Sequence, residues 1–303
     1  MTQAISRRAF IRRATLVAAT IPSAPWRVVN WRAGSASTPL RVGALSSSAS
    51  GDAATGRRLG IQLGIEEAQH AAALFGGSVE LVPTTTSTLR EQALSAVLGV
   101  DDFESCLTLA RAADAARVVF MNVGCTDDRL RAADCRATMF HIIPSDAMYR
   151  DALAQSHAPA GARVTAWDSS LARFGADTLN ERFRAQFSRP MTSDAWLGWF
   201  AVKVVWESSL RAHATDARTL MQYMARDGVQ FDGHKGRPLS FRAWDHQLRQ
   251  PVYVIDAIDV ANARSSEPQP SEIPAAATGD ETSRDILDRI GTPAARSVCR
   301  MTP

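Results

Sequence analysis

From residue 40 the chain alternates short apolar runs with amphipathic segments, and this alternation limits the possible folds more than any other feature. Strands are predicted at 40–45, 78–82, 96–100 and 118–123, and helices at 55–74, 89–95 and 103–116. The apolar run 118–123 is typical of a strand that is buried on both faces. Strands that alternate with helices predict an α/β fold built on a doubly wound parallel sheet.

The alternation fails after residue 144. The pattern there predicts helices at 146–155, 174–187, 193–211 and 215–226, and strands at 163–167, 239–242 and 251–257. Residues 262–282 are rich in Ser, Pro, Glu and Ala, which is typical of a linker or a disordered tail. A short helix is expected at 283–290.

The first residues carry an export signal. Ser6-Arg7-Arg8-Ala9-Phe10-Ile11 is a twin-arginine motif, and the apolar stretch after it, 14–21, is far shorter than the ~20 residues that span a bilayer. A membrane anchor therefore ranks below a twin-arginine signal to the periplasm, cleaved after Ala24 or after Ala36. Loss of residues 1–36 changes the net charge from +3 to −3, which argues against a nucleic-acid partner.

The chain has four cysteines: Cys106, Cys125, Cys135 and Cys299. An oxidising compartment permits disulfides, and four thiols allow three full pairings. Cys106 lies in an apolar helical pattern and is expected to be a buried small side chain. A bond that involves Cys135 is favoured, and its partner stays open. Because no pair shows CxxC spacing, no zinc site is expected.

Polar residues follow three of the predicted strands, at the edge where parallel sheets bind ligands. In the loop after the first strand, hydroxyl groups and free amides before a helix suit an anion, although for any single residue helix capping is the favoured interpretation. It is the convergence of three polar loops on one edge that favours a ligand site. The expected ligand-binding residues are Ser46, Ser47, Asp101, Asp102, Gly124, Cys125 and Thr126.

Nothing in the sequence indicates catalysis or a cofactor. The chain has no G-x-S-x-G, H-E-x-x-H or G-x-G-x-x-G, and Gly51–Gly56 lacks the Lys-Ser/Thr of a phosphate-binding loop. His234 and His246 lie in polar turns, where solvation is expected. The tryptophans Trp196, Trp199 and Trp206 have helical spacing and are expected in the core. We therefore expect a binding protein and not an enzyme.

The segment near the end of the chain resembles one protein family. Phe231-Asp232-Gly233-His234-Lys235-Gly236 is followed by Leu239-Ser240-Phe241 and then by residues 245–254. This succession resembles the closing part of the type 1 periplasmic binding proteins, the branched-chain amino-acid receptor class of ABC importers. The resemblance implies two lobes with a small molecule bound between them, an ABC permease in the inner membrane as partner, and no catalysis.

Finer features resemble the substrate-binding proteins associated with pyrroloquinoline-quinone (PQQ)-dependent alcohol dehydrogenase systems. They are Asp134-Cys135-Arg136, residues 141–146, residues 151–155, Arg189-Pro190-Met191-Thr192, residues 245–251 and Cys299-Arg300. This resemblance implies a link to periplasmic alcohol oxidation by a quinoprotein dehydrogenase. A sensor or accessory protein of such a system, without transport, is the alternative.

The resemblance divides the chain into a signal region (1–36), a first lobe (37–155), a second lobe (156–260) and a flexible tail with a short terminal helix (261–303). Two departures stand out. Asp101-Asp102 replaces the small hydroxyl residue expected in amino-acid receptors, and only 37 residues separate Gln155 from Ser193. A full lobe takes on the order of 100 residues. The second lobe is therefore expected to be reduced, and capture of the solute to be weakened.

Overall fold

The computed structural model describes residues 38–45, 51–99, 102–255, 270–275 and 281–301. The twin-arginine motif, Ser46, Ser47 and Asp101 lie outside these residues. Of the helices that are described, none has the length and apolar character needed to cross a membrane.

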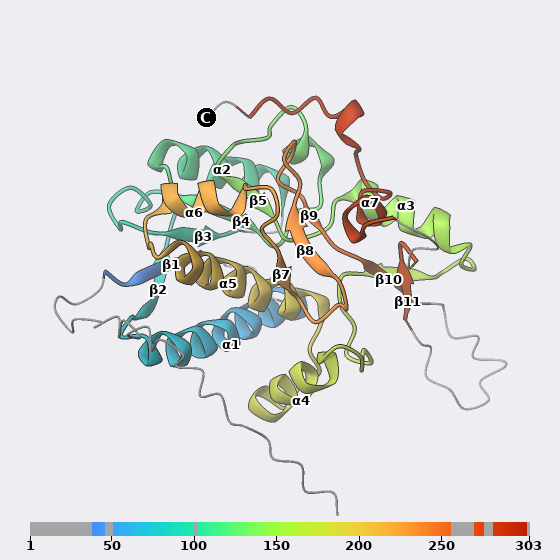
Figure 1. The fold of residues 1–303 in the computed structure, drawn as a ribbon, viewed down its shortest axis with the longest axis horizontal. Coiled ribbons are helices and arrows are strands. Elements are labelled where there is room, and N and C mark those ends of the chain that lie inside the picture. Colours follow the sequence, from blue (N-terminus) through green and yellow to red (C-terminus); the bar gives the residue numbers. More distant parts are fainter. Residues whose placement is uncertain (1–37, 46–50, 100–101, 256–269, 276–280, 302–303) are drawn as a thin grey trace, which may run out of the picture. The chain divides into compact units, whose positions relative to one another are not determined.

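A five-stranded parallel sheet carries the fold, as the sequence predicts (Figure 1). Its order is β2-β1-β3-β4-β5, and every neighbouring pair is parallel. The strands are β1 (Leu40–Leu45), β2 (Val79–Thr84), β3 (Ala96–Leu98), β4 (Val119–Asn122) and β5 (Met139–His141). All residues of β3, β4 and β5 are buried, which agrees with the apolar sequence of β3 and β4.

Helices cover both faces of this sheet (Figure 1). On one face lie α1 (Asp52–Leu74) and α5 (Ser193–Ala212), and on the other lies α2 (Phe103–Ala116). Successive strand residues point to opposite faces, so Ala96 and Leu98 join the core with α1 and α5, while Val97 joins the core with α2. Helix α6 (Ala217–Met224) packs on α5 and β4. The sheet is therefore doubly wound.

Helices α1 and α5 approach each other closely along a row of small residues. Gly56, Gly60 and Gly64 recur every fourth position on α1, so they share one face. A Cβ atom added at Gly60 would lie 1.9 Å from the carbonyl oxygen of Ala195, and one at Gly198 would lie 2.6 Å from a backbone oxygen of α1. Side chains at these positions would push the two helices apart.

A second, antiparallel sheet has the order β11-β10-β6. Helix α3 packs on all three strands, and Met148 and Ala152 of α3 share a core with Val252 and Val254 of β10. The elements of this part are α3 (Asp146–Ser156), β6 (Arg163–Thr165), β10 (Val252–Ile255), β11 (Ser271–Ile273) and α7 (Ser283–Leu287). In Figure 1 they lie to the right of the five-stranded sheet.

The remaining elements are short. A third sheet, β7-β8-β9, is antiparallel. Its strands are β7 (Phe231–Asp232), β8 (Pro238–Phe241) and β9 (Leu248–Arg249); the other elements are α4 (Ala176–Phe187) and the 3-10 turns η1 (Asp128–Arg131) and η2 (Ala294–Arg296).

Two predictions about secondary structure are wrong. Residues 89–95 form turns and not a helix, and Ala93 among them adopts a left-handed φ of 47°, which a right-handed helix does not accommodate. The segment 262–282 is not wholly a linker, because residues 271–273 form β11. Pairing of Glu272 with Tyr253 of β10 and burial of Ile273 stabilise this strand.

The predicted involvement of Cys135 in a disulfide is confirmed. Cys135 bonds to Cys299, with the two Cα atoms 5.7 Å apart, and so ties the end of the chain to the loop before β5. Cys106 and Cys125 are buried thiols, as expected for Cys106.

Candidate functional site

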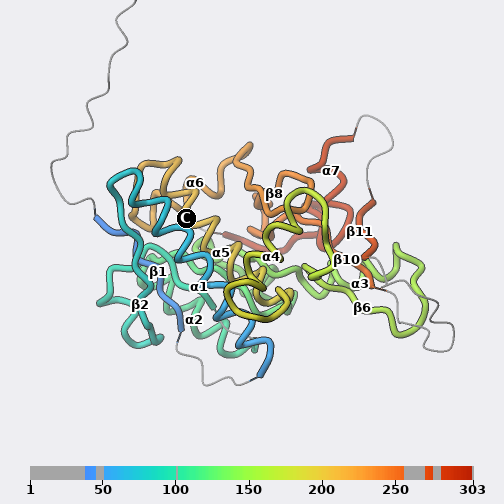
Figure 2. The backbone as a smooth tube through the Cα atoms, turned by 90° about the horizontal axis from the view of Figure 1, so that it is seen from below, coloured from blue at the N-terminus to red at the C-terminus, as the bar shows by residue number. Residues whose placement is uncertain are grey.

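The strand order creates a topological switch point at the carboxyl edge of the five-stranded sheet. Strands β1 and β3 are neighbours, yet α1 leaves β1 toward one face and α2 leaves β3 toward the other. Open α/β sheets bind ligands at such a switch point, where the chain departs in opposite directions from adjacent strands. Of the predicted ligand-binding residues, Asp102, Gly124, Cys125 and Thr126 are described at this edge. Figure 2, seen from below, shows α3, β6, β10 and β11 side by side and apart from β1, β2 and α2.

Asp102 is the N-cap of α2. One of its carboxylate oxygens, Oδ1, accepts a hydrogen bond of 2.9 Å from the backbone N–H of Ser105, and its side chain is exposed to solvent. Hydrogen bonds from Ser105 lower the pKa of Asp102, so the carboxylate is ionised at neutral pH. Asp102 is thus a helix cap that still presents a negative charge to solvent.

Asn122, the last residue of β4, fixes the loop Gly124–Thr126. Its Oδ1 accepts from the backbone N–H groups of Gly124 (3.2 Å) and Cys125 (3.0 Å), and its Nδ2 donates to the carbonyl of Cys125 (2.8 Å). Asn122 is fully buried. Sequence reasoning missed this residue, although an amide at the end of an apolar strand was a signal. The hydrogen bonds to Asn122 therefore preorganise the loop.

Arg131 holds the same loop from the other side. Its buried guanidinium donates to the carbonyls of Cys125, Asp127 and Ile143, each at 3.0 Å, and to Oε1 of Gln247 at 2.8 Å. Burial lowers the pKa of Arg131. These donors are consumed within the chain, so a ligand at this edge would meet the outer surface of the loop.

The first turn of α2 contacts the loop Gly124–Thr126 through the thiol groups of Cys106 and Cys125. Cys125 is 3 % exposed, and a hydrogen bond with Cys106 of α2 is the main cause that lowers the pKa of Cys125 to about 7. The contact brings Asp102 and the half-buried Gly124 and Thr126 to one corner of the sheet. The Cys125 side chain itself points into the interior.

The expectation that His246 is solvated is wrong. The residue is 6 % exposed, and its ring stacks on Phe140 with the ring centres 4.2 Å apart. Its Nδ1 lies 3.2 Å from the carbonyl of Met139, so Nδ1–H donates there. Burial lowers the pKa of His246 to about 4. The turn that carries His246 is covered by β5, which the sequence pattern did not predict.

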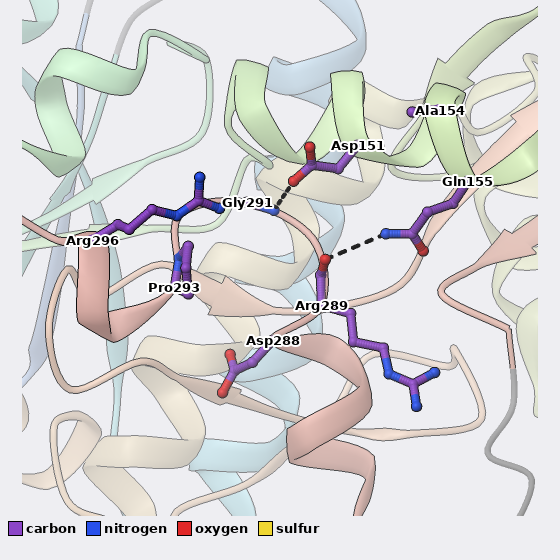
Figure 3. Close-up of a pocket in the computed structure, with 8 residues that line it drawn as sticks. All are labelled: Asp151, Ala154, Gln155, Asp288, Arg289, Gly291, Pro293 and Arg296. Carbon is purple, nitrogen blue, oxygen red and sulfur yellow. Dashed lines mark hydrogen bonds between the residues drawn. The ribbon is translucent and has the colours of Figure 1, made fainter.

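Two cavities lie away from the predicted edge. One of about 320 Å³ lies between α3 and the end of the chain (Figure 3). There Asp151 accepts from the backbone N–H of Gly291 at 2.7 Å, and Gln155 donates to the carbonyl of Arg289 at 3.3 Å. The other, of about 460 Å³, is lined by the loop 170–176, the turn 234–235 and the second sheet. Neither contains a predicted ligand-binding residue.

Within the described ranges, no three His, Cys, Asp or Glu side chains are grouped so as to hold a metal ion.

No family model and no curated protein matches the sequence. Solved structures do match. A branched-chain amino acid ABC transporter periplasmic ligand-binding protein from Burkholderia xenovorans has a TM-score of 0.69 at 11 % identity, over 86 % of this chain and 99 % of its own. The substrate-binding protein LivJ from Streptococcus pneumoniae, in complex with isoleucine, has a TM-score of 0.63 at 13 % identity, over 77 % and 100 %. An ABC transporter solute-binding protein from Rhodopseudomonas palustris, in complex with benzoate, has a TM-score of 0.60 at 12 % identity, over 78 % and 96 %.

These similarities concern the fold. The α/β architecture with its parallel central sheet matches that of type 1 periplasmic binding proteins, as the resemblance in the sequence implies.

Proposed function

We propose that this chain is the periplasmic solute-binding component of an ABC importer, exported by its twin-arginine signal. It binds a small polar molecule at the carboxyl edge of the five-stranded sheet and delivers it to a permease in the inner membrane. The observation that carries this proposal is the switch point between β1 and β3, which Asp102 flanks and beside which lies the fixed loop Gly124–Thr126. Two lobes, 37–155 and 156–260, belong to the same proposal, with two exchanges between them: α3 of the first packs on the second sheet, and α5 of the second packs on α1 and the five-stranded sheet.

The chemistry of the edge favours a ligand that donates hydrogen bonds. Asp102 offers an ionised, exposed carboxylate, while the amide N–H groups of Gly124 and Cys125 are occupied by Asn122. An ammonium or hydroxyl group would pair with this carboxylate. Ser46, Ser47 and Asp101 belong to the proposed site from sequence alone.

We further propose a link to PQQ-dependent alcohol oxidation, with a quinoprotein dehydrogenase system as partner. The disulfide supports this link, because it joins Cys135 to Cys299, and the segments around these two residues are among those that resemble the PQQ-associated binding proteins.

An accessory or sensory role without transport is the second candidate. It is favoured by the size of the second sheet, whose described strands β6, β10 and β11 have three, four and three residues. So small a sheet leaves little surface to close over a ligand. Neighbouring permease and ATPase genes would favour transport, and neighbouring dehydrogenase genes alone would favour the accessory role.

Thermal unfolding of the purified exported chain tests the binding proposal. The compounds are isoleucine, benzoate, short alcohols and polyols. A compound at 100 times its Kd stabilises the folded state by about 2.7 kcal/mol and raises Tm by several degrees.

The decisive variants are Asp102→Asn, which keeps a helix cap but removes the charge, and Glu104→Gln, an exposed carboxylate two residues further on. Asp102→Asn is expected to weaken binding about tenfold, because a charge-assisted hydrogen bond is lost, and Glu104→Gln to leave it unchanged. The proposal fails if no compound raises Tm, or if both variants bind as the wild type does.

A further inference from the structure

The larger cavity is built from parts of the chain that the proposed site does not use. It has a volume of about 460 Å³, within the range of roughly 300–1,000 Å³ of small-molecule sites. Its walls are the loop 170–176, which leads from β6 into α4, the turn 234–235, and β10 and β11 with the preceding Pro270. In Figure 1 this loop and α4 lie below the second sheet.

A buried lysine side chain forms part of its wall. Lys235 is 1 % exposed, and its Nζ donates to Oε1 of Gln250 (2.8 Å) and to the carbonyl of Pro251 (3.0 Å). The same Nζ lies 4.0 Å from the ring centre of Trp196 and 5.4 Å from that of Tyr253. All four partners are neutral. Burial therefore lowers the pKa of Lys235 well below its usual value, and an anion bound beside Nζ would stabilise the ammonium form.

The only carboxylate among the described residues of the cavity wall is already engaged. Glu272 of β11 accepts from Nε of Arg237 at 2.6 Å, so the attraction that it exerts on Lys235 is shared with a second cation. Arg173 adds another positive charge at the exposed rim, and it forms no ion pair with any residue in the described part of the chain. The wall therefore carries more positive than negative charge.

The rest of the wall is apolar. Leu171, Phe174, Tyr253 and Pro270 contribute to it, and Phe174 is 62 % exposed. Phe174 is held in this position: its φ is 58°, its carbonyl lies 3.1 Å from Nδ1 of His234, and its ring covers Gly236, where a Cβ atom would lie 2.3 Å away. A large aromatic ring fixed at the mouth of a cavity is suited to cover an apolar ligand body.

We propose that this cavity is a second small-molecule site, distinct from the carboxyl edge, and that it takes a monocarboxylate with an apolar body. The carboxylate lies toward Lys235 and Arg173, and the apolar part lies against Phe174 and Tyr253. The assignment stands on the cavity's own residues and does not depend on what the carboxyl edge binds.

Calorimetric titration of the full chain with hexanoate, and with hexanamide as an uncharged ligand of the same shape, tests this inference. Hexanoate is expected to bind at least about tenfold more tightly than hexanamide, because only the anion forms charge-assisted hydrogen bonds. No detectable binding of hexanoate, or equal binding of the two compounds, would overturn the inference.

Variants locate the binding. Lys235→Met removes the charge at similar length and is expected to reduce hexanoate affinity at least about tenfold. Since a buried lysine also supports folding, Arg173→Gln and Phe174→Ala, both at exposed positions, serve as second variants, and each is expected to weaken binding about threefold or more. Asp102→Asn is expected to leave hexanoate binding unchanged. If Asp102→Asn reduces it and the cavity variants do not, hexanoate binds at the carboxyl edge; that result refutes this inference and leaves the proposed function standing.

Discussion

His246 is expected to make the fold acid-sensitive. Its pKa is about 4 in the folded chain against an ordinary 6.5, because burial between Phe140 and the turn disfavours the imidazolium. Between these two values the unfolded chain binds a proton that the folded chain does not. The stabilisation is therefore complete above pH 6.5 and is lost as the pH falls through this window toward 4.

The size of the effect follows from the difference in pKa. A shift of about 2.5 units corresponds to about 3 kcal/mol over the whole window, and to about 2 kcal/mol between pH 7 and pH 5. His141, fully buried beside Asn122, has its pKa lowered by burial as well, so it adds to the loss in the same direction.

Urea unfolding at pH 7 and pH 5, followed by the fluorescence of the buried Trp167, Trp196 and Trp199, measures the loss. The test variant is His246→Asn, since asparagine tolerates the left-handed φ of 50° and its amide can donate to the carbonyl of Met139. This variant is expected to be less stable at pH 7, because stacking on Phe140 is lost, but to lose about 2 kcal/mol less than the wild type on going to pH 5.

The matched control is His213→Asn, at the exposed C-cap of α5 with a φ of 51°. It is expected to leave the pH dependence as it is. If His246→Asn loses as much stability between pH 7 and pH 5 as the wild type does, burial of a neutral His246 is not the cause of acid sensitivity and the reasoning is refuted.

Two further predictions concern stability. Cys299→Ser removes a disulfide that spans 164 residues and is expected to lower the free energy of unfolding in urea by about 3–5 kcal/mol. Reduction of the wild-type protein is expected to have the same effect. An unchanged unfolding midpoint after reduction would contradict the prediction. Gly60→Ala places a methyl group 1.9 Å from the carbonyl oxygen of Ala195 and is expected to lower the free energy of unfolding by about 1–3 kcal/mol, measured as a lower Tm. The control Gln62→Ala, on the exposed face of the same helix, is expected to lower it by less than about 0.5 kcal/mol. Equal effects of the two substitutions would show that α1 and α5 do not touch at Gly60.

The sequence predicts the parallel sheet well because its strands are apolar and its helices amphipathic. The helix 103–116 and its cap at Asp102 are found as expected, and so are the helices at 146–155 and 193–211 within a residue or two at their ends. Strand β5 was missed, and so was β11, whose order depends on pairing with β10, about 20 residues away along the chain.

The site is harder to foresee for a different reason. Local patterns place Asp102 and Gly124–Thr126 at the ends of strands, but they do not show that Asn122 accepts from the N–H groups of that loop or that Arg131 donates to one of its carbonyls. Arg131 pairs with Gln247, 116 residues further on, and Lys235 with Gln250, 15 residues further on. Such contacts arise only when distant segments fold together, so the buried network and the larger cavity have no signature in the sequence.

The close contact between α1 and α5 has a consequence for folding during synthesis. On one face of the five-stranded sheet, α1 is joined by a helix that begins at Ser193, so that face is only partly covered until roughly two thirds of the chain has left the ribosome. Before that moment, a nascent chain would expose Leu63, Ile65 and the buried strands to every passing apolar surface. A protein built this way gains from completing its fold before it crosses a membrane, and the proposed twin-arginine route, which carries folded cargo, would allow it to do so.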